Sequence, residues 1–492
     1  MLALSTGILL VVLGFVIPRE QTRLLSRHVR LLDLPLVDEL QLPDTLTPAR
    51  LDLVNTELSF SAYDLASDVY YLPTLDTELS YHPDAELTLS YDAETDQYQL
   101  LAVQDDSYRI YAFIETHLPL MKIETIMGTQ DKQRKRARVE VYDETNTMSE
   151  YMLEYNIRGG TSRSYEKKSY SLHHTYSIPM TMLGLPPNDK YVINSMYEDE
   201  YRIRDVLSWD IYSQFAAYRN PDDRNAVPAM RYIEVFIDDY YMGLYGLQEY
   251  LNEHKLEIEG RFASIYEVGN YVFPGSETPT PGARNWDALS IKYNNREYDE
   301  RWDPMLELVD LMLLEDAAEF NRRADAYFDM ENFTDYYLLI ETLQARDNIW
   351  KNQFYLYEDG ERLQVHPWDL DMTLGAYMDE TVFDLNHVLV LLETGYIYPF
   401  HQLIRYHESF EMTAAERYME LRESFLSTEN LVATADHYHE LLRVTGAFSR
   451  EHARWPNGPK IVEGQEEFIQ GFIREHMDLL DAHFAHVLNG GG

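Results

Sequence analysis

Between residues 345 and 371 the sequence reads ARDNIWKNQFYLYEDGERLQVHPWDLD. A helical pattern ends just before Asp347, which leaves that residue in a loop, with Asn352 five residues later. The alternating segments QFYLY and RLQVH flank a Glu-Asp-Gly turn and predict a β-hairpin. The hairpin leads to Asp369 and Asp371, which lie on one side of the chain if the segment stays extended.

Oxygen ligands in this order suit Mg²⁺, which proteins usually hold with one or two carboxylates while substrate phosphates fill the remaining positions. The order also matches the protein-kinase arrangement Arg-Asp-x-x-x-x-Asn followed by a metal-binding Asp after a hairpin. In that arrangement Asp347 accepts the proton of the substrate hydroxyl. Asn352 holds one metal ion, and Asp369 or Asp371 bridges the metal to the phosphates. The alternative is that each Asp simply forms a turn, as is expected in so acidic a chain.

A second candidate region is a glycine turn followed by basic residues: Gly159, Gly160, Arg163, Lys167 and Lys168. Backbone N–H groups of such a turn can approach an anion, and a lysine on the following strand can pair with phosphates. Strand alternation places Lys168 on the face of the apolar strand positions, so we expect Lys168 to point inward and Lys167 outward. The pattern is neither a Walker A sequence nor the glycine loop of protein kinases. An ordinary glycine turn with a solvated lysine pair is the alternative.

The composition narrows the possible ligands. Of the 492 residues, 84 are acidic and 41 basic, which gives a formal net charge of −43, and none is cysteine. A nucleic-acid backbone would be repelled by most of such a surface, so general nucleic-acid binding is not expected. The lack of cysteine excludes disulfides, thiolate nucleophiles and Cys-ligated zinc or iron–sulfur sites.

Hydrophobic patterning predicts five parts along the chain. They are a hydrophobic segment at 1–18, a linker at 19–50, a β-rich accessory region at 51–115, a further β-rich part at 116–270 and a helical part at 271–492. A strand pair joined by an Asp238-Asp239 turn lies near the middle, and Asp329 is predicted to cap a helix that has one inward apolar face and ends before Asp347. This order of strands and then helices predicts an α+β fold.

The hydrophobic segment carries no charge between residues 2 and 17 and is slightly shorter than the roughly 17–25 residues that span a bilayer. We expect it to be a single membrane anchor, with a cleaved signal peptide and a buried helix as alternatives. Arginines follow the segment and would hold that flank in the cytoplasm by the positive-inside rule, yet no basic residue precedes it. The side of the membrane therefore stays open.

Several blocks of the sequence, taken in order, resemble the CotH (spore coat protein H) kinase-like family of atypical protein kinases. The blocks are LPLMKIET (118–125), IRGGTSRSYEKKSYSL (157–172), YEDEYRIRDVLSWDIY (197–212), YIEVFIDDYYMGLYGLQEYL (232–251), ARDNIWKNQFYLY (345–357), HPWDLDMTLG (366–375) and FIREHMDLLDAHF (472–484). One departure is Asp205, which stands beside Arg204 where the family usually has Asn.

The resemblance implies a two-lobed, atypical protein-kinase-like fold with a β-rich N-lobe and a helical C-lobe, in addition to the N-terminal β-rich accessory region. It implies ATP and Mg²⁺, or Mn²⁺, as cofactors and transfer of the γ-phosphate to Ser/Thr of a partner protein. By position, the implied catalytic residues are Asp347 and Lys168. The implied metal ligands are Asn352, Asp369 and Asp371. The implied cofactor-binding residues are Gly159, Gly160, Arg163, Lys167, Lys168 and Glu249, with Glu249 orienting Lys168.

Two other functions are compatible with the sequence. The triplet Asp369-Leu370-Asp371 is also the pattern of a nucleotide-sugar glycosyltransferase, although no βαβ series opens the chain as that fold requires. A non-catalytic surface or envelope protein that retains the kinase-like fold is the other alternative. Expected partners are a basic, Ser/Thr-containing protein and the membrane, but not nucleic acid. Analogy with the coat-associated family favours an extracytoplasmic catalytic domain.

Overall fold

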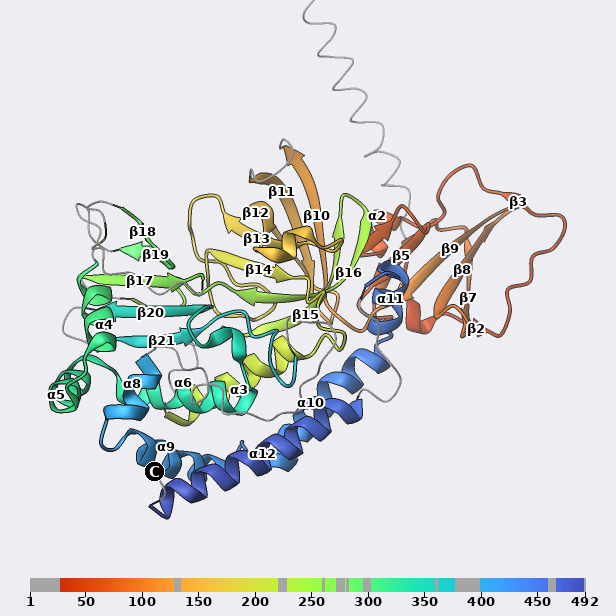
Figure 1. Cartoon of the computed structure of the whole chain (residues 1–492). Coiled ribbons are helices and arrows are strands. Elements are labelled where there is room, and N and C mark those ends of the chain that lie inside the picture. The colour runs from red at the N-terminus through yellow and green to blue at the C-terminus, as the bar shows by residue number, and fades with distance from the viewer. Residues whose placement is uncertain are drawn as a thin grey trace, which may run out of the picture. The chain divides into compact units, whose positions relative to one another are not determined.

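The computed structural model describes residues 27–127, 134–219, 228–258, 262–270, 279, 283–294, 302–358, 362–376, 399–458 and 466–490 (Figure 1). Helices and sheets are both present, so the predicted α+β class is confirmed. The chain divides into two compact units. Unit 1 takes the described residues up to 158, with 232–245 and 442–456, and unit 2 takes 159–231, 246–441 and 457–492.

Unit 1 begins with two sheets around one apolar core. The first pairs β1 (Arg27–Arg30) with β6 (Glu78–Tyr81). The strands of the second sheet are β2 (Leu36–Val37), β3 (Thr47–Pro48), β4 (Ala62–Asp64), β5 (Val69–Leu72), β7 (Glu86–Asp92), β8 (Gln97–Gln104) and β9 (Ser107–Glu115). Their order in the sheet is β2-β7-β8-β9-β5-β4, and β3 also pairs with β9. Short helices η1 (Leu31–Asp33) and α2 (Thr56–Ser59) complete this part. In the core, the buried Tyr111 hydroxyl accepts hydrogen bonds from the backbone N–H groups of Leu53 and Val54 at 2.8 and 3.1 Å.

The same unit contains an antiparallel set formed by β10 (Leu120–Met127), β11 (Lys135–Tyr142) and β12 (Met148–Arg158). Arg138 of β11 lies 3.2 Å from Glu124 on the neighbouring strand β10 and 2.6 Å from Glu140 on its own strand. These pairs fit a structural role for the basic side chain of Arg138. Strand β10 also pairs in parallel with β15 (Met230–Ile237), which leads through Asp238 and Asp239 into β16 (Tyr240–Glu249). Both turn residues have positive φ angles, 52° and 63°, so the predicted tight turn is confirmed.

Helix α11 (Ala447–Arg454) belongs to unit 1 although it lies more than 200 residues after the strands it contacts. Arg450 Nε donates to Glu234 Oε1 at 2.8 Å, and both side chains are buried. Glu451 accepts from the backbone N–H of Leu244 at 2.9 Å, and the Trp455 indole donates to the Met242 carbonyl at 2.8 Å. A buried ion pair and these backbone contacts therefore hold the helix against the strands.

Unit 2 contains two sheets and most of the helices. Strands β13 (Ser169–His174) and β14 (Lys190–Asn194) are antiparallel, and β14 pairs with the last residues of β16. The other sheet has the order β18-β19-β17-β20-β21, with β17 (Ala263–Val268), β18 (Asn285–Trp286), β19 (Leu289–Asn294), β20 (Gln353–Glu358) and β21 (Gln364–Pro367). The predicted hairpin is confirmed as β20 and β21, which pair antiparallel from Gln353 opposite Pro367 to Leu356 opposite Gln364.

Helix α6 (Met330–Leu343) lies at the centre of the helical part of unit 2 (Figure 1). Asp329 caps it by accepting from the N–H of Asn332 at 3.2 Å, as predicted. Every side chain from Asn332 to Leu343 is buried, so the helix is covered on all sides rather than on one face. The remaining helices are α3 (Arg204–Arg219), α4 (Asp303–Leu313), α5 (Ala317–Tyr327), α8 (Pro399–Tyr406), α9 (Phe410–Arg422), α10 (Thr428–Val444) and α12 (Glu466–Leu488).

Helices α9 and α12 pack against α6 and against each other. None of the helices in the described part of the chain is long and apolar enough to cross a membrane. The predicted anchor at residues 1–18 lies outside the described residues.

Replacing Arg450 by Met should lower the free energy of unfolding by about 3–5 kcal/mol, because the Glu234 carboxylate would remain buried without its cation. Burial raises the pKa of Glu234, and the Arg450 charge opposes that rise. Urea denaturation of the full chain measures the loss. The control is Arg30→Met, which removes an exposed pair with Asp33 in the same unit and should leave the midpoint nearly unchanged. Equal midpoint shifts in the two variants would contradict this account of α11.

Candidate functional site

Asp347 lies in the turn that follows α6. The helix ends at Gln344, whose left-handed conformation (φ 50°, ψ 46°) redirects the chain into the short helix η4 (Arg346–Asn348). Asp347 is buried, with 7% of its surface exposed. Its Oδ2 accepts hydrogen bonds from Lys351 Nζ at 2.6 Å and from Asn352 Nδ2 at 2.7 Å. Asp347 and Asn352, which the sequence predicted in separate roles, are therefore in direct contact. Lys351 is a member of the site that the sequence interpretation missed.

Asn348 joins this loop to the segment that carries the other two aspartates. Its buried Nδ2 donates to the carbonyls of Asn352 at 3.1 Å and Trp368 at 2.8 Å. The Trp368 N–H in turn donates to the Asn352 carbonyl at 2.8 Å. Because Trp368 precedes Asp369, these bonds fix the distance between the two halves of the motif. No pattern of residues around Asn348 predicted that its side chain would join the two segments.

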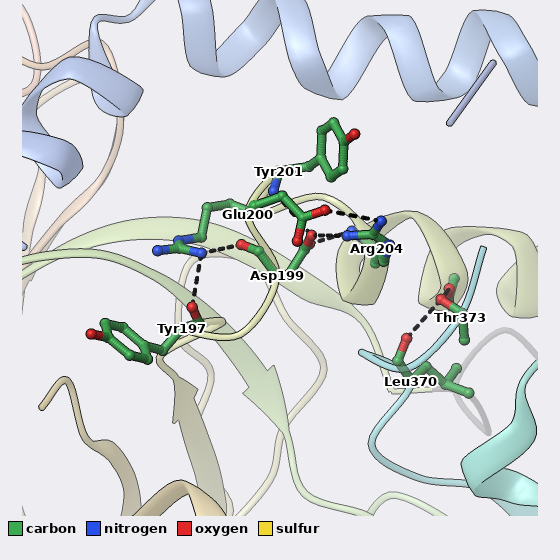
Figure 2. Close-up of polar contacts among 9 residues, drawn as sticks. Tyr197, Asp199, Glu200, Tyr201, Arg204, Leu370 and Thr373 are labelled. Atoms are coloured by element: carbon green, nitrogen blue, oxygen red, sulfur yellow. Dashed lines mark hydrogen bonds and ion pairs between the residues drawn. The ribbon is translucent and has the colours of Figure 1, made fainter. Parts of the chain in front are cut away.

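The segment after β21 is a turn rather than an extension of the strand. Asp369 has a φ of +58°, and the chain turns from Leu370 through Asp371. Thr373 Oγ1 closes the turn by donating to the Leu370 carbonyl at 3.0 Å (Figure 2). The condition under which Asp369 and Asp371 were expected to share one side, an extended segment, is therefore not met, because the left-handed residue at 369 interrupts the extended conformation.

Five carboxylate side chains influence one another electrostatically around this turn, and we call them the acidic cluster: Glu198, Asp205, Asp347, Asp369 and Asp371. Burial, and then the charge of Asp369, raises the pKa of Asp205 to about 7. Burial, followed by the charges of Asp369 and Asp205, holds the pKa of Asp371 well above its usual range. Desolvation raises the pKa of Glu198, which accepts a hydrogen bond from Tyr165. Such crowding of like charges favours the binding of a cation.

One face of α3 holds the turn in place. Ser208 Oγ lies 2.9 Å from Thr373 Oγ1, and the Tyr212 hydroxyl lies 3.2 Å from His366 Nδ1. The rings of Trp209 and Trp368 meet edge to face, with centroids 6.1 Å apart. With Asp205, these residues of α3 follow the spacing of a single helical face.

The start of α3 is fixed by Arg204, which is fully buried. Its guanidinium lies between Asp199 and Glu200, with Nη1 2.7 Å from Asp199 Oδ1 and Nη2 3.4 Å from Glu200 Oε1 (Figure 2). The second oxygen of Asp199 accepts the backbone N–H of Arg204 at 2.8 Å. The charge of Arg204 is therefore directed at Asp199 and Glu200 rather than at the acidic cluster.

The glycine turn reaches the acidic cluster through an aromatic side chain. Gly159 has a φ of +104°, and a Cβ at that position would lie 1.9 Å from Ser162 Oγ. The turn continues into η2 (Thr161–Ser164) and then to Tyr165, whose hydroxyl donates to Glu198. Gly159 is thus required by the backbone, which agrees with the predicted turn.

The two lysines after the turn lie opposite to the expectation. Lys167 is completely buried, whereas Lys168 is partly exposed and donates to the carbonyls of Arg163, at 2.8 Å, and Tyr165. Strand β13 begins only at Ser169, so the alternation of a strand does not apply to either lysine. The prediction that Lys168 points inward and Lys167 outward is therefore wrong.

Glu249 also has a different partner from the expected one. Both of its carboxylate oxygens accept from Lys255 Nζ at 2.9 Å, and Oε2 accepts the Ala229 N–H at 3.1 Å. Both members of the pair are buried. Burial raises the pKa of Glu249 and lowers the pKa of Lys255, and the attraction between them opposes both shifts. Glu249 therefore orients Lys255 rather than Lys168.

The oxygen atoms of three side chains near this turn are of the kind that a hard divalent cation prefers. Across the described ranges, no three His, Cys, Asp or Glu side chains converge closely enough to hold a metal ion by themselves. Asn352, Asp369 and Asp371 offer an amide oxygen and two carboxylates, and phosphate and water complete the coordination that Mg²⁺ prefers. The residues present are therefore compatible with Mg²⁺.

Comparison with known families agrees with this geometry. The sequence model of the CotH kinase protein family matches residues 155–480, which include the glycine turn, α3, Asp347 and the turn with Asp369 and Asp371. This chain belongs to the CotH kinase family, and the resemblance described above is confirmed. No curated protein matches the chain.

The glycine turn can be tested with two glycine substitutions that are expected to change the free energy of unfolding in opposite directions. Gly159→Ala should lower the free energy of unfolding by about 1–3 kcal/mol, because alanine disfavours the positive φ angle. Gly471→Ala should instead raise stability by up to about 1 kcal/mol, because Gly471 lies in α12 with open space at its Cβ position. Urea denaturation measures both. A neutral effect at Gly159 would contradict the left-handed turn.

The reassigned ion pair gives a second test. Lys255→Met should destabilise the protein by about 3–5 kcal/mol, because it leaves the Glu249 carboxylate buried without its partner. Adding Glu249→Leu should restore most of the loss, since a buried pair can be replaced by apolar groups. Lys168→Met is the matched control and should cost little, because Lys168 is partly exposed and donates to the loop carbonyls of Arg163 and Tyr165. A larger loss of stability for Lys168→Met than for Lys255→Met would contradict the assignment of Lys255 as the partner of Glu249.

Proposed function

We propose that this chain transfers the γ-phosphate of ATP to a Ser or Thr hydroxyl of a partner protein. The observation that carries the proposal is the position of Asp347, a buried carboxylate oriented by Lys351 and Asn352 at the edge of the acidic cluster. Membership of the CotH kinase family supports a kinase-like function for that carboxylate. A two-lobed, kinase-like arrangement of β-rich and helical parts is part of the same proposal.

In this mechanism Asp347 accepts a hydrogen bond from the acceptor hydroxyl and aligns its oxygen with the γ-phosphorus. As the new O–P bond forms and the bond to the β-phosphate oxygen breaks, the hydroxyl proton passes to Asp347 and ADP leaves. Lys351 lies 2.6 Å from the same carboxylate, so it limits the repulsion between Asp347 and an approaching phosphate. Asn352 donates through Nδ2 to Asp347, which leaves its Oδ1 as an acceptor for a metal ion.

Asn352, Asp369 and Asp371 would hold Mg²⁺ or Mn²⁺, which supplies neutralisation of the phosphate charge when bound. The turn closed by Thr373 and held by Ser208 keeps the two carboxylates in place against their repulsion. Phosphoryl transfer depends mainly on positioning and electrostatic stabilisation, so a rigid turn is the feature such a site requires.

The remaining parts of the proposal concern partners. A net charge of −43 favours a basic protein substrate through electrostatic attraction. The hydrophobic segment at 1–18 is proposed to anchor the chain in a membrane, with the catalytic part on the extracytoplasmic side. Phosphosites that depend on Asp347 and that are enriched in neighbouring Lys and Arg would support the basic substrate.

Replacing Asp347 by Ala should reduce Mg²⁺-dependent phosphorylation, measured as self-phosphorylation or transfer to a basic model protein, by about 10²–10⁴-fold, because the base is removed. Asp371→Ala should abolish the divalent-cation-dependent phosphorylation, because it removes a proposed ligand of the cation. Asp210→Asn is the control, since Asp210 lies on α3 beside Tyr438 and His437. If wild type binds no ATP in a thermal-shift assay with Mg²⁺ or Mn²⁺, the proposed phosphoryl transfer fails, and consumption of a UDP-sugar would favour a glycosyltransferase.

A further inference from the structure

A surface groove lies at the beginning of helix α6, at the opposite end of that helix from Asp347. It consists of two adjoining cavities of about 880 and 390 Å³, and Asp325, Met330 and Glu331 line both of them. Each volume is within the range of pockets that hold ligands. The larger cavity extends to the β20–β21 hairpin at Leu356, and the smaller one extends to the start of α9. We call the two cavities together the α6 groove.

The α6 groove carries more negative than positive side chains. Five carboxylates and two guanidinium groups line it, which gives a formal charge of −3 with histidine neutral. The carboxylates are those of Asp325, Asp329, Glu331, Asp335 and Glu358, and the guanidinium groups are those of Arg362 and Arg417. This balance favours a cationic ligand. Because the chain as a whole is acidic, the charge alone does not distinguish the groove from other surfaces.

A buried histidine is the independent observation that points to a ligand. His407 lines the smaller cavity, and only 7% of its side-chain surface is exposed. Its Nε2 lies 3.0 Å from Asp325 Oδ1, so Nε2 carries a hydrogen and donates it to the carboxylate. In the neutral ring Nδ1 is then an acceptor, and within the described structure this buried atom has no hydrogen-bond partner. A buried acceptor without a donor is costly, and an N–H group of a bound ligand would satisfy it.

The rest of the smaller cavity suits a long basic side chain. Met330 and the buried Phe410 offer apolar surface, along which the methylene stem of a lysine or arginine can pack. Ser409 lines the same cavity, and its hydroxyl makes no capping hydrogen bond to α9. An apolar wall, neutral acceptors and exposed carboxylates together match an ammonium or guanidinium group on an aliphatic stem.

We propose that the α6 groove is the docking site for a Lys/Arg-rich segment of the partner protein, with His407 Nδ1 accepting a hydrogen bond from one of the basic side chains. This inference rests on the proposed function, because it assigns the groove to the basic substrate of the phosphoryl transfer. Helix α6 has 14 residues, so its two ends are about 20 Å apart. An extended chain needs at least about six residues to cover that distance, which sets the shortest separation between the basic segment and the phosphorylated Ser or Thr.

The first test measures binding without any activity, by fluorescence anisotropy of a labelled peptide of alternating Lys and Arg with the full chain and no ATP. The double variant Asp325→Asn/Glu331→Gln removes two exposed charges of the groove and should raise Kd by about tenfold or more. His407→Leu keeps both charges and should raise Kd by about 3–10-fold, because it removes the acceptor.

Glu416→Gln is the matched control, because Glu416 is an exposed carboxylate of α9 that does not line the groove. It should leave Kd unchanged. The double variant alters only exposed side chains, so it decides the question if His407→Leu fails to fold. Equal increases in Kd for the double variant and for Glu416→Gln would overturn the inference in favour of general charge effects.

The second test compares two substrates. A Ser-containing peptide with a basic block about eight residues away should have a higher kcat/KM than the same peptide without the block, because the block reaches the groove. The double variant should reduce the ratio of the two kcat/KM values toward one, whereas Glu416→Gln should leave the ratio unchanged.

The two tests separate this inference from the proposed function. If wild type does not bind the basic peptide, or if the double variant binds it as tightly as wild type, the inference is overturned, and continued phosphate transfer would leave the proposed function intact. An unchanged Kd in a folded His407→Leu variant would overturn the role of Nδ1. If wild type transfers no phosphate but binds the peptide more tightly than the double variant, the groove is a binding site for basic segments and the proposed function fails.

Discussion

Repulsion among buried and half-buried carboxylates around the turn from Trp368 to Thr373 is the constraint on which the rest of the site depends. Burial makes the charged forms of the Asp205 and Asp371 carboxylates unfavourable, and the negative charge of Asp369 adds to the effect. The hydrogen bonds from Lys351 and Asn352 offset the charge of Asp347. The charge that remains favours a divalent cation, which is also what the proposed phosphoryl transfer requires.

A cluster of like charges keeps its geometry only if the backbone beneath it is rigid. Here the rigidity comes from neutral contacts: Asn348 bridges the two halves of the motif, and the face of α3 with Ser208 and Tyr212 holds the other side of the turn. The fully buried α6 carries Asp347 at its end. Buried hydrogen bonds of this kind are stronger than their exposed equivalents because water does not compete for them.

The parts of the site that the sequence predicted correctly are local. The cap of α6 at Asp329 and the β20–β21 hairpin both involve residues close in sequence, so periodicity and turn chemistry were sufficient. Predictions that required a distant partner were less successful. Glu249 pairs with Lys255 rather than Lys168, and Asp369 adopts a left-handed conformation that the alternating pattern did not indicate. Strand β13 begins after both lysines, so strand alternation did not predict that Lys167 is the buried one.

The sequence by itself determined the α+β class and the family, because these depend on residue types at fixed spacings, and it singled out four candidate site residues around the hairpin. Only the tertiary structure showed that Asp205 lies in the acidic cluster, since α3 and the turn after β21 are about 165 residues apart and meet through Ser208 and Thr373. It alone placed α11 in unit 1, through the pair of Glu234 and Arg450. Burial and charge compensation act between neighbours in space, and a single sequence does not record which distant residues become neighbours.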